Sequence, residues 1–196
     1  MKNIKPDIRF LNDIKDVLYD KKWAKNAPNF ELYLMYRGLK EKNGLRYDIT
    51  EMPPRLLGKE FVKTKGHIHI GGYSEVYIVL DGKAIFLMQK CNKKSVKDVY
   101  GVEVGKEEVL ILPPYYHHIT INPSTKNNLK WANWISKKCQ SDYSFIQKQE
   151  GACYFYTKGG WVKNKNYKNI PEIRFEKPRK SPPKNLNFLK EGKQEP

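Results

Sequence analysis

The stretch KGHIHIGGYSEVY, residues 65–77, carries two of the four histidines in a chain of 196 residues. Side chains on a β-strand alternate between its two faces, so His67 and His69 project from the same face, about 6 to 7 Å apart along the chain. Both imidazoles can then reach one metal ion. Gly71 and Gly72 allow the chain to bend, and Glu75 begins the next apolar run. The bend can therefore return the Glu75 carboxylate to the histidine pair.

The other two histidines lie in ILPPYYHHITIN, residues 111–122. Pro113 and Pro114 break the strand before them, because proline cannot donate a hydrogen bond to a β-ladder. His117 and His118 then precede a β-branched run. Adjacent strand residues face opposite ways, so at most one of these two histidines should face a shared site. The spacing does not say which one.

Each of these features alone is more typical of a solvated polar strand face than of a site. All four histidines nevertheless fall into two clusters, each beside a glycine or proline bend, and this concentration favours a metal centre. Three imidazoles and one carboxylate without a thiolate suit iron(II), manganese, nickel, copper or zinc. A structural zinc site is more usually closed by cysteines. Four protein ligands leave two positions open for substrate if the ion is octahedral.

The chain around these motifs has the pattern of an all-β protein. Short runs rich in Val, Ile, Tyr and Phe alternate with turn residues, which is typical of a sandwich or barrel. The clearest hairpin prediction is VYIVL-DG-KAIFLM, because Asp81-Gly82 is a pair that two-residue type I′ turns prefer. The predicted strands are Phe30–Tyr36, Leu45–Thr50, Phe61–Thr64, Glu75–Leu80, Ala84–Gln89, Val109–Leu112, Ile119–Asn122, Leu129–Ile135 and Gly151–Thr157.

The two ends of the chain differ in composition from the middle. A short helix is predicted over Leu11–Leu18, ended by the NAPN sequence at residues 26–29. After Glu176 the chain is rich in proline and lysine and poor in core residues. We therefore expect an N-terminal extension, residues 1–29, that packs on a β domain, residues 30–175. Residues 176–196 should form a basic tail that is mobile or lies along the surface.

The composition indicates a folded protein of a reducing compartment. Hydrophobic residues at 39% and aromatic residues at 13% are too abundant for a disordered chain, despite 30% charged residues. The three cysteines are far apart and form no CxxC pair, so neither a disulfide framework nor a thiolate site is expected. The first ten residues lack an apolar targeting region, and no apolar run approaches a membrane span. We expect a soluble cytoplasmic protein.

The net charge of +16, from 37 basic and 21 acidic residues, would attract anions. Nucleic acid, acidic lipid and a phosphorylated metabolite all fit that sign. The basic residues are mostly lysines spread along the chain, which is typical of a solvated surface. No known nucleic-acid-reading motif accompanies them, so nucleic acid is the least favoured partner.

Two motifs carry a resemblance to a known family. GHIHIGGYSEVYIVLDG, residues 66–82, resembles the first cupin motif, and PPYYHHITIN, residues 113–122, resembles the second. More narrowly, TKGHIH, SEVY and PPYYHHITIN resemble the archaeal-type cupin glucose-6-phosphate isomerases. The resemblance extends from LYLMYRG, residues 32–38, through WANWIS, residues 131–136, and on to Asp142-Tyr143. It implies an RmlC-like jelly-roll barrel for the β domain.

The resemblance also implies a set of site residues. The implied metal ligands are His67, His69, Glu75 and His118, which favours His118 over His117. The implied phosphate-binding residues are Thr50, Thr64, Gly66 and Tyr36. The chain departs from the family in having Tyr115 where cupins often have glycine and a spacer between His69 and Glu75 that is one residue shorter. A tyrosine that some members carry after the second motif falls here near Trp134 or Ile135.

The implied activity is the interconversion of glucose 6-phosphate and fructose 6-phosphate, in glycolysis and gluconeogenesis. Glu75 is the expected base of a proton transfer through a cis-enediolate, with Tyr77 orienting the sugar or relaying a proton. A metal-assisted hydride shift is the alternative. The resemblance implies one divalent ion per subunit, iron(II) before manganese, nickel or zinc, and a homodimer without nucleic-acid or membrane partners. The competing functions are a non-catalytic sugar-binding cupin and a cupin-type metal-dependent dioxygenase.

Overall fold

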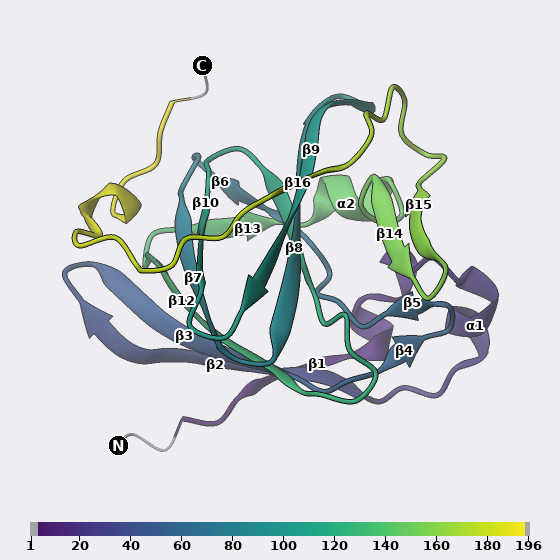
Figure 1. Ribbon diagram of the computed structural model, residues 1–196, viewed down its shortest axis with the longest axis horizontal. Helices are drawn as coiled ribbons and strands as arrows, with labels where there is room; N and C mark the ends of the chain where they lie inside the picture. Colours follow the sequence, from purple (N-terminus) through teal and green to yellow (C-terminus); the bar gives the residue numbers. More distant parts are fainter. Residues whose placement is uncertain (1–3, 195–196) are drawn as a thin grey trace.

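Two β-sheets face each other across a shared hydrophobic core in the computed structural model, which describes residues 4–194 (Figure 1). The first sheet is antiparallel. In spatial order it contains β1 (Asp7–Phe10), β2 (Glu31–Lys42), β3 (Leu45–Met52), β12 (Leu129–Ser136), β7 (Glu75–Asp81) and β10 (Val109–Leu112). The second contains β11 (His117–Ile121), β8 (Lys83–Asn92), β9 (Ser95–Gly105) and β16 (Arg174–Glu176), the last parallel to β9.

Shorter strands extend this framework. The strand β6 (Ile68–Ile70) pairs with β13 (Gln140–Asp142), and a bridge between His67 and His118 joins this pair to β11. A further sheet has the order β15 (Gly160–Lys163), β14 (Tyr154–Thr157), β5 (Glu60–Phe61) and β4 (Leu56–Leu57). The helix α2 (Ser144–Lys148) lies between β13 and β14 in the chain.

Two strands of the second sheet, β8 and β11, are buried on both faces over most of their length. Along β8, Ala84, Phe86 and Met88 pack in the core between the two main sheets. Ile85 and Leu87 point the other way, into a second core shared with β14 and with Phe145 of α2. Because both faces are covered, every residue of β11 is buried, polar ones included. This arrangement confirms the predicted all-β barrel of the cupin type.

The Asp81-Gly82 pair is a corner between the two sheets, so the hairpin prediction is wrong. The strands β7 and β8 pair with other strands and not with each other. Gly82 has φ +75°, and a Cβ atom there would clash with the backbone carbonyl of Asn128. The glycine is needed because another segment crosses closely over the corner. A two-residue hairpin with positive φ at both positions occurs instead at Asn43-Gly44, between β2 and β3.

The N-terminal extension forms short 3₁₀ turns in place of the predicted helix over residues 11–18. These turns are η1 (Leu11–Asp13) and η2 (Lys15–Val17), and the helix α1 (Lys21–Asn26) follows. The fully buried side chains of Leu11, Ile14 and Val17 recur every three residues. That spacing matches the three residues per turn of a 3₁₀ helix. Asp20 then caps α1 by accepting a hydrogen bond from the Trp23 backbone at 3.0 Å.

The strand β9 was missing from the sequence prediction. Lys97, Asp98 and Glu103 interrupt its apolar residues and hide the pattern of a strand. The full length of β9 nevertheless pairs with β8 through a tight turn at Lys93-Lys94. Here tertiary packing outweighs local composition.

The C-terminal segment crosses the molecule and ends against the first sheet (Figure 1). Arg174 pairs with Asp98 where β16 joins β9. Farther along, the turn η3 (Asn187–Leu189) places Leu189, which has no exposed surface, against Val76 and Val109 on the outer face of the first sheet. The tail thus lies along the surface and covers apolar side chains that would otherwise be exposed.

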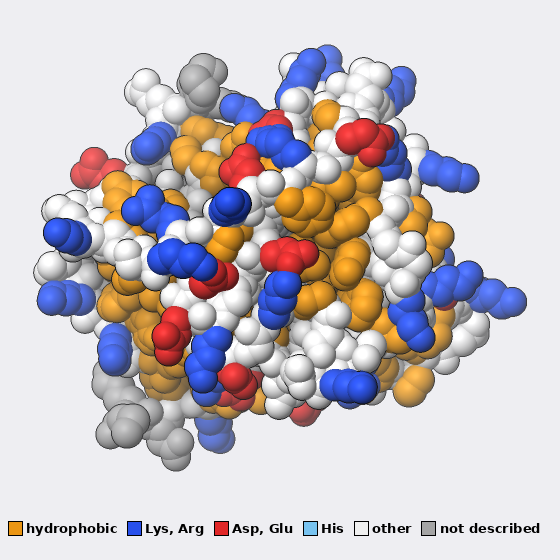
Figure 2. Space-filling view, viewed as in Figure 1, with side chains coloured by type: hydrophobic (Ala, Val, Ile, Leu, Met, Phe, Trp, Pro, Cys, Tyr) orange, Lys and Arg blue, Asp and Glu red, His pale blue; other side chains and the backbone are white. Residues whose placement is uncertain are grey.

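The basic residues are dispersed. Figure 2 shows lysine and arginine side chains over the whole of one face, interleaved with acidic and apolar side chains. Among residues 4–194, no helix has both the length and the apolar character required to span a bilayer.

Candidate metal centre and its cavity

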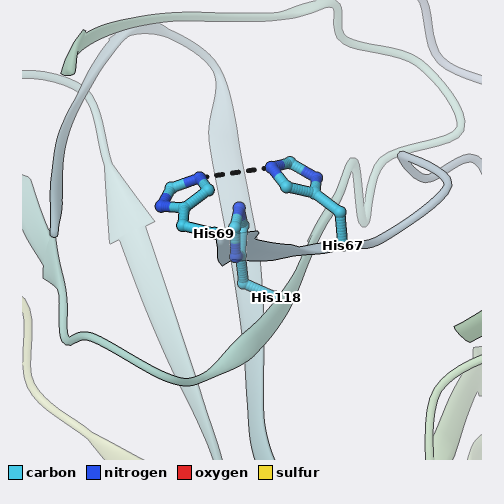
Figure 3. Close-up of side chains that lie close together, drawn as sticks. All are labelled: His67, His69 and His118. Carbon is cyan, nitrogen blue, oxygen red and sulfur yellow. Dashed lines mark hydrogen bonds between the residues drawn. The ribbon is translucent and has the colours of Figure 1, made fainter. Parts of the chain in front are cut away.

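Three histidine rings converge at the edge of the second sheet. His67 precedes β6, His69 lies within it, and His118 lies on β11. One nitrogen from each ring lies within 4.8 Å of the others, and the Nε2 atoms of His67 and His69 are 3.3 Å apart (Figure 3). Paired backbone hydrogen bonds between His67 and His118, at 2.9 and 3.3 Å, hold the two strands in register. The three histidines could hold a metal ion.

The hydrogen bonds of the rings leave nitrogen lone pairs for such an ion. His69 Nδ1 lies 2.9 Å from the carbonyl oxygen of Tyr73. A carbonyl only accepts, so Nδ1 carries the proton and Nε2 keeps its lone pair, as in metal-binding histidines generally. His118 Nδ1 lies 3.4 Å from the Tyr116 carbonyl. His118 Nε2 is buried, and within the described part of the chain it has no hydrogen-bond partner. An ion at the centre would satisfy this nitrogen.

The protonation states of the rings also fit metal binding. Burial lowers the pKa of His67 and His118 well below the usual value, and nearby histidines lower it further. Burial also lowers the pKa of His69 to about 4, against a hydrogen bond to the Tyr73 backbone that raises it. All three imidazoles are therefore neutral at pH 7, which is the form that binds a metal.

Glu75 brings a carboxylate to the same centre. Its Oε2 atom is 3.4 Å from His69 Nε2 and 3.9 Å from His118 Nε2. Burial raises the pKa of Glu75 to about 8, although a hydrogen bond from Tyr77 opposes that rise. The Tyr77 hydroxyl donates to Oε2 at 2.5 Å. At pH 7 a side chain with a pKa of about 8 is mostly protonated, and a positive charge at the centre would favour the carboxylate form. The donor set therefore fits a divalent cation, which would supply that charge.

A cavity opens from this centre toward the predicted phosphate-binding residues. Thr50, Thr64 and Gly66 line it together with the three histidines, Glu75 and Tyr77. The Thr64 hydroxyl accepts a hydrogen bond from the Thr120 backbone at 3.0 Å. Gly66 has φ +87°, and a Cβ there would lie 2.6 Å from Cγ1 of Ile119. This tight crossing requires glycine at position 66.

Two predicted positions lie elsewhere. Tyr36 does not line the cavity, because β2 turns Tyr33 and Met35 inward and Tyr36 to the opposite face. His117 points away from His118 into the second core, where its ring lies 4.7 Å from the ring of Phe145. The structure thus brings His118 and not His117 to the centre.

The cavity also contains residues that the sequence did not identify. Tyr143 lines it with its ring 5.2 Å from that of His67, whereas Trp134 packs outside against Tyr47. The cationic side chains that line it are Arg9, Arg37, Arg46 and Lys65. Strand alternation from Thr50 through its partner Met35 could have identified Tyr33. No sequence signal marked the arginines.

The family model and the curated relatives agree on one family. The family model described as glucose-6-phosphate isomerase (GPI) matches residues 18–172. The glucose-6-phosphate isomerase of Thermococcus litoralis is 31% identical over 133 residues, which cover 64% of this chain and 67% of that protein. The enzyme of Pyrococcus furiosus is 30% identical over 125 residues, which cover 60% of this chain and 64% of that protein. The enzyme of Thermococcus onnurineus is 29% identical over 165 residues, which cover 80% of this chain and 82% of that protein. The chain thus spans about two thirds of the first two relatives.

The likeness to solved structures is partial. Oxalate oxidase in complex with the substrate analogue glycolate gives a TM-score of 0.41 at 15% identity, covering 51% of this chain and 46% of that one. Tomato vicilin gives a TM-score of 0.43 at 14% identity, and the match covers 57% of this chain and 31% of the vicilin chain. The family match, in contrast, extends over most of the chain and includes all four histidines. The chain therefore belongs to the glucose-6-phosphate isomerase family, with relatives in archaea of the genera Thermococcus and Pyrococcus.

Proposed function

We propose that this protein is a metal-dependent isomerase that interconverts glucose 6-phosphate and fructose 6-phosphate. The observation that carries the proposal is the meeting of three neutral imidazoles and the buried Glu75 carboxylate in one cavity with Thr50 and Thr64. Membership of the family and the names of the relatives support the substrate pair.

In this proposal His67, His69, His118 and Glu75 hold one divalent ion, iron(II) before manganese, nickel or zinc. When bound, the ion supplies a Lewis acid that polarises the sugar carbonyl and stabilises negative charge on its oxygens. The protein residues fix the position of the sugar. The hydroxyls of Thr50 and Thr64 and the backbone beside Gly66 bind the phosphate, so that remote binding energy orients the reacting carbons.

Glu75 and Tyr77 carry the proton transfer in the enediolate form of the mechanism. Glu75 removes the proton from one carbon and returns it to the neighbouring carbon, while the Tyr77 hydroxyl orients the carboxylate through its bond to Oε2. The hydroxyl proton of the sugar passes from the oxygen of one carbon to the oxygen of the other, and Tyr77 relays it. The side chains of Glu75 and Tyr77 are at most 5% exposed and line the cavity. A carboxylate beside a divalent cation has a reduced proton affinity. A direct hydride shift between the two carbons is therefore the alternative. It needs no base at carbon, although the hydroxyl proton still passes from one sugar oxygen to the other.

Metal analysis coupled to an isomerase assay tests the proposal. The purified protein is assayed with glucose 6-phosphate and with fructose 6-phosphate, before and after chelation and after metal is restored. We expect about one ion per chain and activity that follows metal content. Activity that survives thorough metal removal would overturn the metal dependence. Turnover in deuterium oxide separates the mechanisms, since solvent deuterium in the product requires the enediolate.

The alternative functions give different results in the same experiments. A non-catalytic sugar-binding cupin binds fructose 6-phosphate without turnover, and a dioxygenase consumes oxygen with a suitable substrate. The proposal also includes a cytoplasmic homodimer that works in glycolysis and gluconeogenesis and has neither nucleic-acid nor membrane partners. The division into an extension, a barrel domain at residues 30–175 and a tail belongs to the same proposal.

A further inference from the structure

The edge strand β1 brings an arginine into the cavity from outside the family-matched segment. Arg9 lies directly opposite Tyr33 in the pairing of β1 with β2, so both side chains are on the same face. The register of this pair shifts between Arg9 and Phe10. Such irregularities commonly re-aim a side chain near a site. The family model begins at residue 18, so Arg9 lies outside the segment that it matches.

Arg9 lies beside the candidate phosphate-binding segment. It lines the same cavity as Thr50, Thr64 and Gly66. Burial raises the pKa of Tyr33 to about 12, and the charge of Arg9, a hydrogen bond with the Lys65 backbone and a side-chain hydrogen bond with Arg9 oppose that rise. Arg9, Tyr33 and the Lys65 backbone are therefore neighbours, and Lys65 lies between Thr64 and Gly66 in the sequence.

The other cations of the cavity already have carboxylate partners. Arg37 Nε lies 3.0 Å from Asp7, Arg46 Nε lies 3.0 Å from Asp48, and Lys65 Nζ lies 3.9 Å from Asp16. For Arg9, in contrast, no carboxylate of residues 4–194 forms an ion pair. Its Nε is buried and has no hydrogen-bond partner in that part of the chain. A buried guanidinium donor without an acceptor is costly to fold unless a ligand supplies the acceptor.

We propose that Arg9 binds the phosphate group of the sugar phosphate, as a guanidinium that the N-terminal extension adds to the threonine pocket. The inference rests on the proposed function and specifies how its substrate is selected. The planar fork of arginine donates two parallel hydrogen bonds to phosphate oxygens. Arg9 therefore discriminates a phosphorylated sugar from the same sugar without phosphate, and it acts on binding rather than on chemistry.

Calorimetry on the metal-loaded full chain tests the proposal, with fructose 6-phosphate and fructose as the two probes. The variant Arg9→Met keeps the length of the side chain and removes the donors. We expect it to weaken fructose 6-phosphate binding by about 10- to 100-fold, the usual worth of a hydrogen bond to a charged group, without weakening fructose binding. Arg9→Lys keeps the charge but loses the planar fork of the guanidinium. Its affinity for fructose 6-phosphate should therefore lie between those of the wild type and Arg9→Met. If Arg9→Met fails to fold, Arg9→Lys carries the test alone, with weaker binding than wild type expected.

The matched control is Arg179→Met, which removes one exposed charge far along the chain from the cavity segments. Its affinity should equal that of the wild type. Equal losses in Arg9→Met and Arg179→Met, or wild-type affinity in Arg9→Met, would overturn the role of Arg9. In turnover, Arg9→Met should raise KM and leave kcat nearly unchanged.

The two proposals fail in different ways. A wild-type protein whose binding of fructose 6-phosphate depends on Arg9, but which does not interconvert the sugars, overturns the isomerase and leaves the Arg9 assignment standing. An active isomerase whose KM is unchanged in Arg9→Met overturns only the Arg9 assignment. A protein that binds no fructose 6-phosphate overturns both.

Discussion

His117 and His118 are adjacent in the chain but lie in different environments, one on each face of β11. His118 faces the centre with an unpartnered buried nitrogen, whereas His117 packs against Phe145 in the second core. A strand that is buried on both faces separates the two roles by a single residue, because its side chains alternate.

This separation allows a matched test of the metal centre. His118→Ala removes one of four proposed ligands, so we expect metal content to fall well below one equivalent and activity to fall by more than about 100-fold. His117→Gln is the control and should keep both the metal and the activity. Metal analysis of the two purified variants checks the expectation. Full metal occupancy in His118→Ala would contradict the proposed ligand set.

The candidate site could be predicted from the sequence as far as strand alternation and motif spacing reach. His67, His69 and Glu75 are close in the chain, and the Gly71-Gly72 bend brings them together. Tyr36 does not line the cavity, because it is next to Met35 on β2 and adjacent strand residues point to opposite faces of the sheet. Arg9 could not be predicted at all. Its position depends on which strand the N-terminal segment pairs with, and no local pattern encodes that choice.

Turns between elements also show that local sequence does not determine which strands pair. Asp81-Gly82 and Asn43-Gly44 both have the composition of a type I′ hairpin turn, yet only the second joins paired strands. Whether two consecutive strands share a sheet depends on the packing of the whole barrel. The individual strands, whose apolar residues alternate locally, were predicted more reliably than their connections. Several strands were nevertheless missed, among them β1, β13, β15 and β16. The longest of the missed strands is β9, whose charged residues disguise a strand that packing buries.

Glycine substitutions measure the difference between the two turns. Gly82→Ala introduces a methyl group against the Asn128 carbonyl and also strains a positive φ. We expect it to lower the free energy of unfolding by about 3 kcal/mol or more. Gly44→Ala, at φ +79° with no atom near the new methyl group, should lose only about 1 to 2 kcal/mol. Urea denaturation checks both, and equal losses would show that the close crossing at the corner contributes nothing.

A buried ion pair attaches the N-terminal extension to the barrel. Lys63 Nζ lies 3.3 Å from Glu60 Oε2, and both side chains are at most 4% exposed. Lys63 also donates to the Val17 carbonyl at 2.7 Å, and Glu60 accepts from the Tyr19 backbone at 2.6 Å. The pair thus connects the strand β5 and the residues after it with the segment that follows η2.

Substitution of one partner should be much more harmful than substitution of both. Lys63→Met leaves the Glu60 carboxylate buried without a cation, and we expect a loss of about 3 to 5 kcal/mol in unfolding free energy. The double variant Lys63→Met, Glu60→Gln keeps an oxygen acceptor for Tyr19 and removes the charge, so it should recover more than half of that loss. Thermal and urea unfolding of the three proteins test this. A double variant no more stable than the single one would rule out charge burial as the cause.

At the scale of the whole molecule, the tail connects the outer face of the first sheet to the loop beside the candidate metal centre. Leu189 packs on Val76 and Val109. Beyond it, the Lys193 backbone donates to the Gly72 carbonyl at 3.3 Å, and the Tyr115 hydroxyl donates to the carbonyl of Lys193. Gly72 lies in the loop between His69 and Glu75. The tail therefore supports the loop that carries two of the proposed ligands.

Shortening the chain to end at Asn185 should loosen this loop. We expect the metal-loaded truncated protein to release its ion to a chelator about 10-fold faster than the full chain, as when outer support of a metal ligand is lost. Leu189→Ala in the full chain is the control. It should lose about 2 to 3 kcal/mol of stability but keep the Lys193 contacts and the original release rate. Equal release rates for the truncated and full chains would contradict the supporting role of the tail.

The position of Lys193 in the chain also orders events during biosynthesis. The Gly71-Gly72 loop leaves the ribosome 121 residues before Lys193, counting from Gly72 (193 − 72). At about 5 to 20 residues per second this interval lasts on the order of 10 seconds. Throughout this interval the loop lacks its contacts with Lys193, so His69 and Glu75 at its two ends are less constrained than in the full chain.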